Sequence, residues 1–375
     1  MDKKTILIKA NTMILPRIGG EGYISGVGRS TKSLVFALLK EKKSFNIALY
    51  ATGLNSYWMK DINLPCKKYS FLLPQKIGTQ LTKIEPFYVH HCMKHDLIHI
   101  PHNYDVVSKK DNMVVTMHDT CLYDIAKRNG DTHMVSLWET TAKQAVGIIT
   151  CSENTKLDII DRFGVEEDNI QVVPWGISHD IFFKEEQNIT TERIHKLGIT
   201  SPFFLAVSCA NKRKNIKNLL KGFEIFAQDN INVTLVLLWS NPPVELLERF
   251  QPLIVNKRVI FLNFVTDQEL NALYNEALAT LFPSRYEGFG FPILESFACG
   301  TPVMTCKNSS LKEIGKDLAI YTKEDDIEQM AAIMQELSTG SYKTKQLSAV
   351  YRTYAQTFSW KKTAHAYISF YEKYL

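Results

Sequence analysis

Short runs of β-branched and other apolar residues alternate along the chain with longer stretches whose apolar positions recur at helical spacing. Short apolar runs of this kind are typical of parallel strands that flanking helices bury on both faces. We therefore predict successive βα units. The predicted strands are Thr5–Lys9, Phe45–Tyr50, Leu97–Ile100, Val114–Met117, Gly147–Thr150 and Gln171–Val173, followed by Phe203–Val207, Val233–Leu238, Val259–Asn263, Ala279–Phe282 and Pro302–Met304.

The strands fall into two groups, and a chain of 375 residues is too long for one ordinary core. Residues 178–200 are polar and poor in helical pattern up to Thr191–Leu197, which is typical of a linker after Pro174-Trp175-Gly176. We predict doubly wound domains over residues 1–178 and 179–357, each with an α/β fold. A helical pattern over 358–375 forms the tail.

Charge and cysteine usage exclude several classes of protein. The net charge is +5, and residues 1–178 carry 22 Lys+Arg against 18 Asp+Glu. This excess is too small for a dedicated nucleic-acid binder, but it would suit an anionic acceptor or membrane surface as well as a solvated face. The seven cysteines are scattered without a C-x-x-C motif, which argues against a disulfide framework or a structural zinc site and favours the cytoplasm.

No apolar run reaches the ~18 residues of a membrane span, and the run near the start is too short for a signal peptide. We therefore expect membrane contact, if any, to be peripheral, at the inner face of the membrane.

Glycines follow the first predicted strand, at Gly19–Gly22 and at Gly26 and Gly28, before a helix predicted over Thr31–Lys40. Such a loop lets backbone N–H groups approach an anion, although a tight turn without a ligand explains the glycines equally well. The nicotinamide fingerprint G-x-G-x-x-G is not met, and no acid ends the second strand. A nicotinamide oxidoreductase is therefore disfavoured.

His118 and Asp119 follow the predicted strand Val114–Met117 directly. The carboxyl ends of strands are where α/β folds bind ligands. A histidine there can hydrogen-bond a sugar or phosphate, and Asp119 can orient it or cap the next helix. We favour a ligand site over a purely structural pair.

A basic cluster, Asn211-Lys212-Arg213-Lys214-Asn215, lies between the strand Phe203–Val207 and a helix predicted over Ile216–Phe226. Cations at a strand-to-helix turn can bind a diphosphate, with help from the helix dipole. A solvated basic loop is the alternative.

The most informative segment joins the strand Ala279–Phe282 to a helix that is predicted to start near Pro292 and end at Gly300. Glu287 lies in the glycine-rich turn and Glu295 one helical turn into the helix. A carboxylate can accept two hydroxyl hydrogens from a diol, and the backbone N–H groups of Gly288, Phe289 and Gly290 can donate to other hydroxyls. This combination suits a polyhydroxylated ligand.

Taken in order, these motifs resemble the retaining glycosyltransferases of family 4, which have the two-domain GT-B fold. The resemblance covers essentially the whole chain. Its motifs are Ser25-Gly26-Val27-Gly28-Arg29, Thr116-Met117-His118-Asp119, Ser152-Glu153-Asn154-Thr155-Lys156, Val172-Val173-Pro174-Trp175-Gly176, Arg213-Lys214-Asn215, the Glu287-x7-Glu295 block and Phe358-Ser359-Trp360.

The resemblance implies a role for each candidate residue. Arg213 and Lys214 would hold the donor diphosphate, Glu295 the nucleotide ribose, and Glu287 with the Gly288–Gly290 backbone the transferred sugar. His118 would lie near sugar and acceptor, with Asp119 beside it, and Gly26 and Gly28 would approach the donor. The terminal helix would cross back to the first domain, and the domains would close on a cleft.

Two positions depart from the family pattern. Ser208 stands where many relatives carry a further arginine, so the diphosphate would depend more on Arg213 and Lys214. Trp175 replaces the usual asparagine before Gly176, where we expect it to shape the linker rather than the chemistry.

Retention without a metal or an obvious carboxylate nucleophile favours front-face substitution, in which a phosphate oxygen takes the acceptor's proton. Glu287 as a covalent nucleophile is the less favoured alternative. No D-x-D motif follows a predicted strand, so we expect neither a metal nor a cofactor. The residues of these motifs most resemble those of hexosyltransferases of bacterial polysaccharide assembly. GDP-mannose is the first candidate for the donor, and UDP-sugars remain as alternatives. The acceptor would be a glycan or a lipid-linked glycan. A nucleotide-sugar 2-epimerase of the same fold and a non-catalytic nucleotide-sugar or glycan-binding subunit remain as alternatives.

Overall fold

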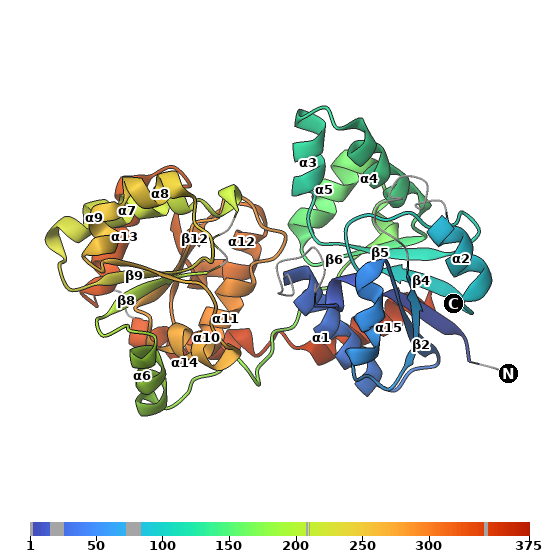
Figure 1. Cartoon of the computed structure of the whole chain (residues 1–375), viewed down its shortest axis with the longest axis horizontal. Helices are drawn as coiled ribbons and strands as arrows, with labels where there is room; N and C mark the ends of the chain where they lie inside the picture. Colours follow the sequence, from blue (N-terminus) through green and yellow to red (C-terminus); the bar gives the residue numbers. More distant parts are fainter. Residues whose placement is uncertain (1–2, 16–25, 73–83, 208, 210, 341–343) are drawn as a thin grey trace. The chain divides into compact units, whose positions relative to one another are not determined.

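The structure, a computed structural model, describes residues 3–15, 26–72, 84–207, 209, 211–340 and 344–375. The chain folds into two compact units (Figure 1). Unit 1 comprises Met1–Gly176 with Trp360–Leu375, and unit 2 comprises Ile177–Ser359. Each unit is a parallel sheet flanked by helices, so the predicted α/β class is confirmed.

Unit 1 contains a seven-stranded sheet in the order β3-β2-β1-β4-β5-β6-β7, in which every described pairing is parallel. Its strands are β1 Thr5–Lys9, β2 Asn46–Thr52, β3 Lys67–Phe71, β4 Leu97–Ile100, β5 Met113–Met117, β6 Gly147–Thr150 and β7 Ile170–Val172. Its helices are α1 Gly26–Lys40, α2 Ile84–Cys92, α3 Cys121–Arg128, α4 Thr132–Gln144, α5 Glu153–Phe163 and α15 Trp360–Glu372.

Unit 2 contains a six-stranded parallel sheet in the order β10-β9-β8-β11-β12-β13. Its strands are β8 Phe203–Ala206, β9 Thr234–Leu238, β10 Val259–Leu262, β11 Ala279–Phe282, β12 Val303–Cys306 and β13 Ile320–Thr322. Its helices are α6 Gln187–Lys196, α7 Ile216–Asp229, α8 Val244–Arg249, α9 Gln251–Val255, α10 Asp267–Glu276, α11 Phe291–Cys299, α12 Ser309–Gly315, α13 Ile327–Ser338 and α14 Thr344–Ala355.

Strand burial follows from the two helical layers. The side chains of β4, β5 and β6 in unit 1, and of β8, β11 and β12 in unit 2, are buried along their whole lengths. This is why these segments appear in the sequence as continuous apolar runs rather than as alternating patterns.

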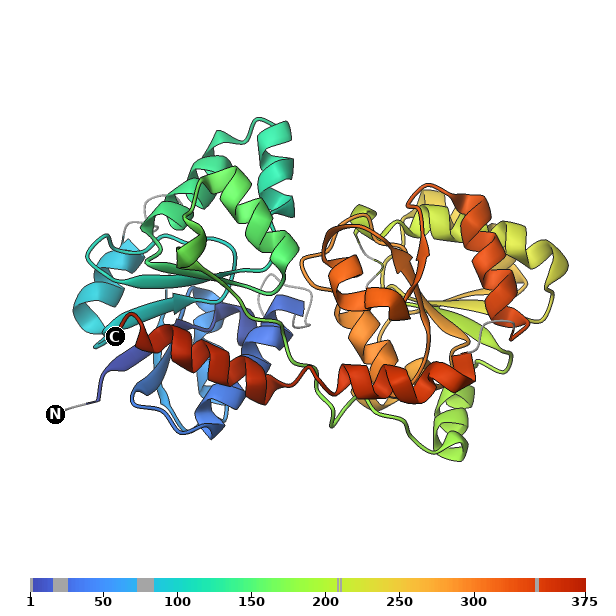
Figure 2. The same ribbon diagram turned by 180° about the vertical axis from the view of Figure 1, so that it is seen from behind.

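The chain passes between the units twice, and the two crossings run side by side. Ile177 forms a parallel bridge with Ser359, and His179 Nε2 lies 3.0 Å from the carbonyl oxygen of Phe358. After the second crossing, α15 packs against α1 in unit 1 (Figure 2). Unit 1 is therefore built from both ends of the chain.

Candidate active site

The sheet order of unit 2 brings the basic cluster and the glutamate loop together. The chain order reverses between β8 and β11, which are paired neighbours, so the loops after these strands meet at the carboxyl edge of the sheet. Open α/β sheets bind ligands at this kind of switch point. Residues that are more than seventy positions apart in sequence thus come into hydrogen-bonding contact.

The basic cluster is a single 3-10 turn, η6 (Lys212–Lys214), between β8 and α7. The side chain of Asn211 caps this turn by accepting the N–H of Arg213 at 3.0 Å. Asn215 adopts a left-handed conformation at φ 61°, which asparagine tolerates better than most residues, and α7 follows it. The turn and the asparagines at its two ends fix the backbone positions from which the Arg213 and Lys214 side chains extend.

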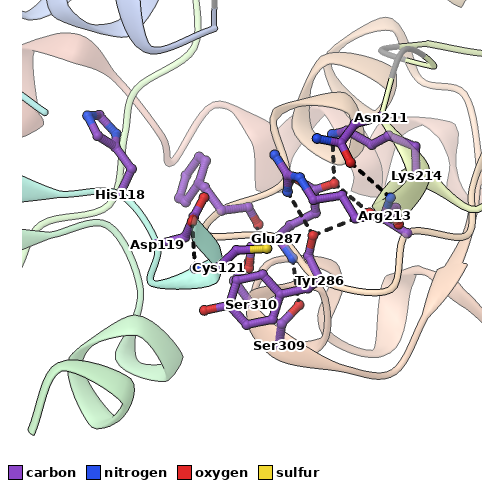
Figure 3. Close-up of polar contacts among 12 residues, drawn as sticks. His118, Asp119, Cys121, Asn211, Arg213, Lys214, Tyr286, Glu287, Ser309 and Ser310 are labelled. Carbon is purple, nitrogen blue, oxygen red and sulfur yellow. Dashed lines mark hydrogen bonds and ion pairs between the residues drawn. The ribbon is translucent and has the colours of Figure 1, made fainter. Parts of the chain in front are cut away.

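Glu287 lies between these cations (Figure 3). Lys214 Nζ is 2.6 Å from Glu287 Oε1, and Arg213 Nη1 is 2.7 Å from Glu287 Oε2. Ser284 donates its hydroxyl to Oε1 at 2.6 Å. Arg213 also donates to the carbonyl of Tyr286 at 2.8 Å, so the guanidinium holds both the backbone and the carboxylate of the loop.

The cluster is shielded from solvent on the side of Lys214 and Glu287. Their side chains are 11% and 9% exposed, whereas the Arg213 side chain keeps 28%. Burial lowers the pKa of Lys214, and the neighbouring Glu287 carboxylate opposes that shift. With all three groups ionised, two cations face one anion, and the cluster keeps one net positive charge.

The backbone of the glutamate loop is held by two serines that begin α12. The Glu287 N–H donates to Ser309 Oγ at 3.0 Å. Ser310 Oγ lies 2.7 Å from the Glu287 carbonyl and 2.8 Å from that of Phe289. Because β12, which precedes α12, pairs with β11, these serines lie beside the loop. Their role was not predicted from the sequence, since serine is common at the start of a helix and its presence there does not indicate contact with a distant loop.

The predicted helix after the loop is α11, preceded by Gly290 at φ 117° and followed by Gly300 at φ 82°. Pro292 lies in its first turn, as predicted. Glu295 lies on α11, and its Oε2 accepts the hydroxyl of the fully buried Tyr274 at 2.7 Å. Tyr274 thus orients the second glutamate of the pair.

His118 and Asp119 lie in unit 1, directly after β5. His118 Nε2 is 3.0 Å from the carbonyl oxygen of Pro101, and its ring stacks on Trp175 at a centroid distance of 5.5 Å. Burial lowers the pKa of His118 to about 4, so the ring is neutral at pH 7 and Nε2 carries the proton that Pro101 accepts. This tautomer leaves Nδ1 as an acceptor.

Asp119 Oδ1 accepts the N–H of Cys121 at 3.0 Å, which caps the start of α3 (Figure 3). Trp175 is buried against the His118 ring, so its packing bears on the candidate site as well as on the linker.

The glycines of unit 1 correct one expectation. Within the described residues, the helix predicted over Thr31–Lys40 already includes Gly26 and Gly28, so both glycines belong to the helix rather than to the preceding loop. Glycine within a helix costs only about 1 kcal/mol relative to alanine, so two glycines do not prevent the helix from including them. The other glycines of the motif, Gly19–Gly22, lie outside the described residues, as does Ser208.

Within the described ranges, no group of three or more His, Cys, Asp or Glu side chains is arranged to hold a metal ion. In the same residues, no helix has the length and apolarity that crossing a bilayer requires.

Comparison with known proteins gives two family matches. Residues 24–181 match the model described as Glycosyltransferase Family 4, and residues 189–356 match the model described as Glycosyl transferases group 1. The two models lie one after the other along the chain and cover all the described candidate residues.

Individual relatives agree with these matches. The serotype-specific mannosyltransferase WbdA of Escherichia coli is 24% identical over 92% of this chain. The chain spans only 46% of the length of WbdA. The O-antigen chain mannosyltransferase B of E. coli is 25% identical over 72% of this chain and 74% of its own length.

A solved structure matches the whole chain in fold. HepE of Anabaena, in complex with UDP and glucose, superposes with a TM-score of 0.73 over 99% of this chain and 100% of its own, at 17% sequence identity. The chain belongs to the group 1 glycosyltransferases of family 4 and has the GT-B fold.

Proposed function

We propose that this enzyme transfers a hexose, with mannose as the first candidate, from a nucleoside diphosphate sugar to a glycan or lipid-linked glycan in bacterial polysaccharide synthesis. The observation that carries the proposal is the cluster of Arg213, Lys214 and Glu287 at the switch point of unit 2. The names of WbdA and O-antigen chain mannosyltransferase B support mannose and a polysaccharide acceptor. The HepE complex with UDP and glucose supports a nucleotide-sugar donor.

In this proposal Arg213 and Lys214 hold the donor diphosphate, and their charges stabilise the diphosphate as it departs. Glu295, oriented by Tyr274, accepts from the ribose. Glu287 and the N–H groups of the Gly288–Gly290 turn bind the sugar. Two fixed cations beside the leaving group are what a reaction without a metal ion requires.

The chemistry we propose retains the anomeric configuration. The acceptor oxygen bonds to the anomeric carbon on the face from which the diphosphate leaves, and the bond from that carbon to the diphosphate oxygen breaks. A phosphate oxygen takes the proton of the acceptor hydroxyl. The protein contributes positioning and electrostatic stabilisation.

The proposal is tested by thermal unfolding of the whole chain with a panel of GDP- and UDP-sugars, each with and without EDTA. A ligand that binds only the native state stabilises it, by about 2.7 kcal/mol when the free ligand concentration is a hundred times Kd. This added stability raises the unfolding temperature. We expect a shift with one nucleotide family, GDP first, and the same shift with EDTA. A shift that EDTA abolishes would contradict the metal-free site, and no shift with any donor would favour a subunit without activity.

A further inference from the structure

The carboxylate of Glu287 has little spare capacity to accept further hydrogen bonds. An ionised carboxylate offers about four lone-pair positions on its two oxygens. Oε1 accepts from Lys214 and Ser284, and Oε2 accepts from Arg213. Three of the roughly four positions are therefore engaged, and a diol that needs two of them can bind only after a contact is released.

The same contacts occupy the cations that the donor diphosphate requires. The two nitrogen–oxygen distances, 2.6 Å for Lys214 and 2.7 Å for Arg213, are those of charge-assisted hydrogen bonds to an oxyanion. Glu287 is 7% exposed, so solvent screens these pairs weakly. In this arrangement the carboxylate takes the place that a phosphate oxygen would take.

The carboxylate can leave the cations without moving the loop that carries it. The Glu287 backbone is held separately, through its N–H on Ser309 and its carbonyl on Ser310. The Arg213 side chain is the more exposed of the two cations, at 28%, and offers an approach for an incoming anion.

We infer that Glu287 is a resident counter-ion of the anion site, which the donor diphosphate displaces from Arg213 and Lys214. The displaced carboxylate then has lone pairs available for the hydroxyls of the sugar. Recognition of the sugar thus depends on prior binding of the diphosphate, and a free hexose binds poorly. The inference rests on the proposed function, because it takes the diphosphate as the ligand of the two cations.

The test measures binding of inorganic pyrophosphate by calorimetry, in EDTA, to the whole chain and to the Glu287→Gln variant. Pyrophosphate carries no sugar, so a residue that only contacts the sugar has no effect on its affinity. A resident counter-ion competes with pyrophosphate, and we expect its neutralisation to tighten binding roughly tenfold or more. The same variant should lose sugar transfer.

The control is Glu324→Gln, which removes the same charge from the same unit. Glu324 contacts Arg285 and Asn308 instead of the two cations. We expect this variant to change pyrophosphate affinity by less than about twofold, since the Glu324 side chain is 34% exposed and solvent screens its charge. Equal tightening in both variants would show a general charge effect and would overturn the inference.

A second variant guards against misfolding, because Glu287→Gln leaves two buried cations without a counter-ion. Glu287→Asp keeps the charge but shortens its reach, and we expect a pyrophosphate affinity between those of the wild type and Glu287→Gln. Unchanged or weaker pyrophosphate binding in both Glu287 variants would overturn the inference that Glu287 is a resident counter-ion. If the wild type still bound a nucleotide-sugar donor, the proposed function would stand. No pyrophosphate binding by any form, and no donor binding, would overturn both.

Discussion

At the scale of single residues, Arg213, Lys214 and Glu287 show what a sequence can and cannot predict. Each was selected for its residue type and its place after a strand. Their contact with one another was not predicted, because it depends on β8 and β11 being neighbours in the sheet. Ser284 was overlooked for the same reason, since its hydroxyl matters only through the carboxylate that it contacts.

His118 is a residue whose environment could not be predicted from its neighbours in sequence. Trp175 lies far along the chain, yet its ring stacks on the imidazole and contributes to its burial. A buried imidazole disfavours its charged form, so the histidine is a hydrogen-bonding group at neutral pH rather than a cation.

The depressed pKa of His118 predicts a pH dependence of stability. The unfolded imidazole takes up a proton below pH 6.5, whereas the folded one does so only near pH 4. Stability therefore falls as the pH drops from 6.5 towards 4, by about 1.4 kcal/mol per pH unit, and is about 2 kcal/mol lower at pH 5 than at pH 7 through this group alone.

We expect the His118→Gln variant to lose about 2 kcal/mol less than the wild type between pH 7 and pH 5, measured by urea unfolding at each pH. Each protein is compared with itself at the two pH values, so any loss of stability that the substitution causes equally at both cancels. Parallel losses in the two proteins would show that His118 is not buried in its neutral form.

At the scale of elements, the interior strands and two of the four edge strands, β7 and β10, were predicted, whereas the other two edge strands were not. β3 and β13 are edge strands of their sheets, and both were overlooked. β3 has only exposed and half-buried side chains, so it lacks the apolar run that marks an interior strand. β13 has three residues, too few to show a period.

The turn before α11 supports a prediction about the loop that carries Glu287. Gly290 has φ 117°, and a Cβ there would lie 3.3 Å from both Ile293 Cδ1 and Leu311 Cδ2. Gly164 also has a positive φ, 63°, but a Cβ at that position would meet no atom within 4 Å. The two glycines thus differ in the space available for a Cβ atom. They also differ in φ, since 63° lies in the left-handed helical region and 117° lies outside it.

We expect Gly290→Ala to lower the free energy of unfolding by about 2–4 kcal/mol and to reduce sugar transfer, because the loop must shift. Gly164→Ala should cost about 1–2 kcal/mol, the usual penalty of a left-handed alanine, and leave transfer unchanged. Chemical denaturation and initial rates measure the two effects. Equal costs for the two alanines would mean that the contacts around Gly290 impose no constraint.

At the scale of the whole molecule, unit 1 depends on the end of the chain. Tyr371 Oη lies 2.8 Å from His99 Nδ1, and His99 Nε2 lies 2.8 Å from Thr116 Oγ1. Tyr367 Oη lies 3.0 Å from the same threonine oxygen. All four residues are fully buried, so α15 satisfies polar groups of β4 and β5 that water cannot reach. The helical tail was predicted from its period, but this hydrogen-bond network needed the fold.

Ending the chain at Ser359 should therefore destabilise unit 1 and spare unit 2. Removal of α15 leaves His99 and Thr116 without their tyrosine partners and exposes apolar surface of α1. Hydrogen exchange should show lost protection in β4 and β5, with β8 and β11 protected as in the full chain. Protection of β4 and β5 equal to that of the full chain would contradict the assignment of α15 to unit 1.

The central claim is that the cluster of Arg213, Lys214 and Glu287 binds the donor and stabilises the departing diphosphate. Its most direct test is kcat/KM for sugar transfer by Lys214→Ala and Glu287→Ala, with the donor that stabilises the wild type and with circular dichroism to confirm the fold. We predict that kcat/KM falls at least about 10²–10³-fold in each variant. Wild-type kcat/KM in both folded variants would show that the transfer site lies elsewhere.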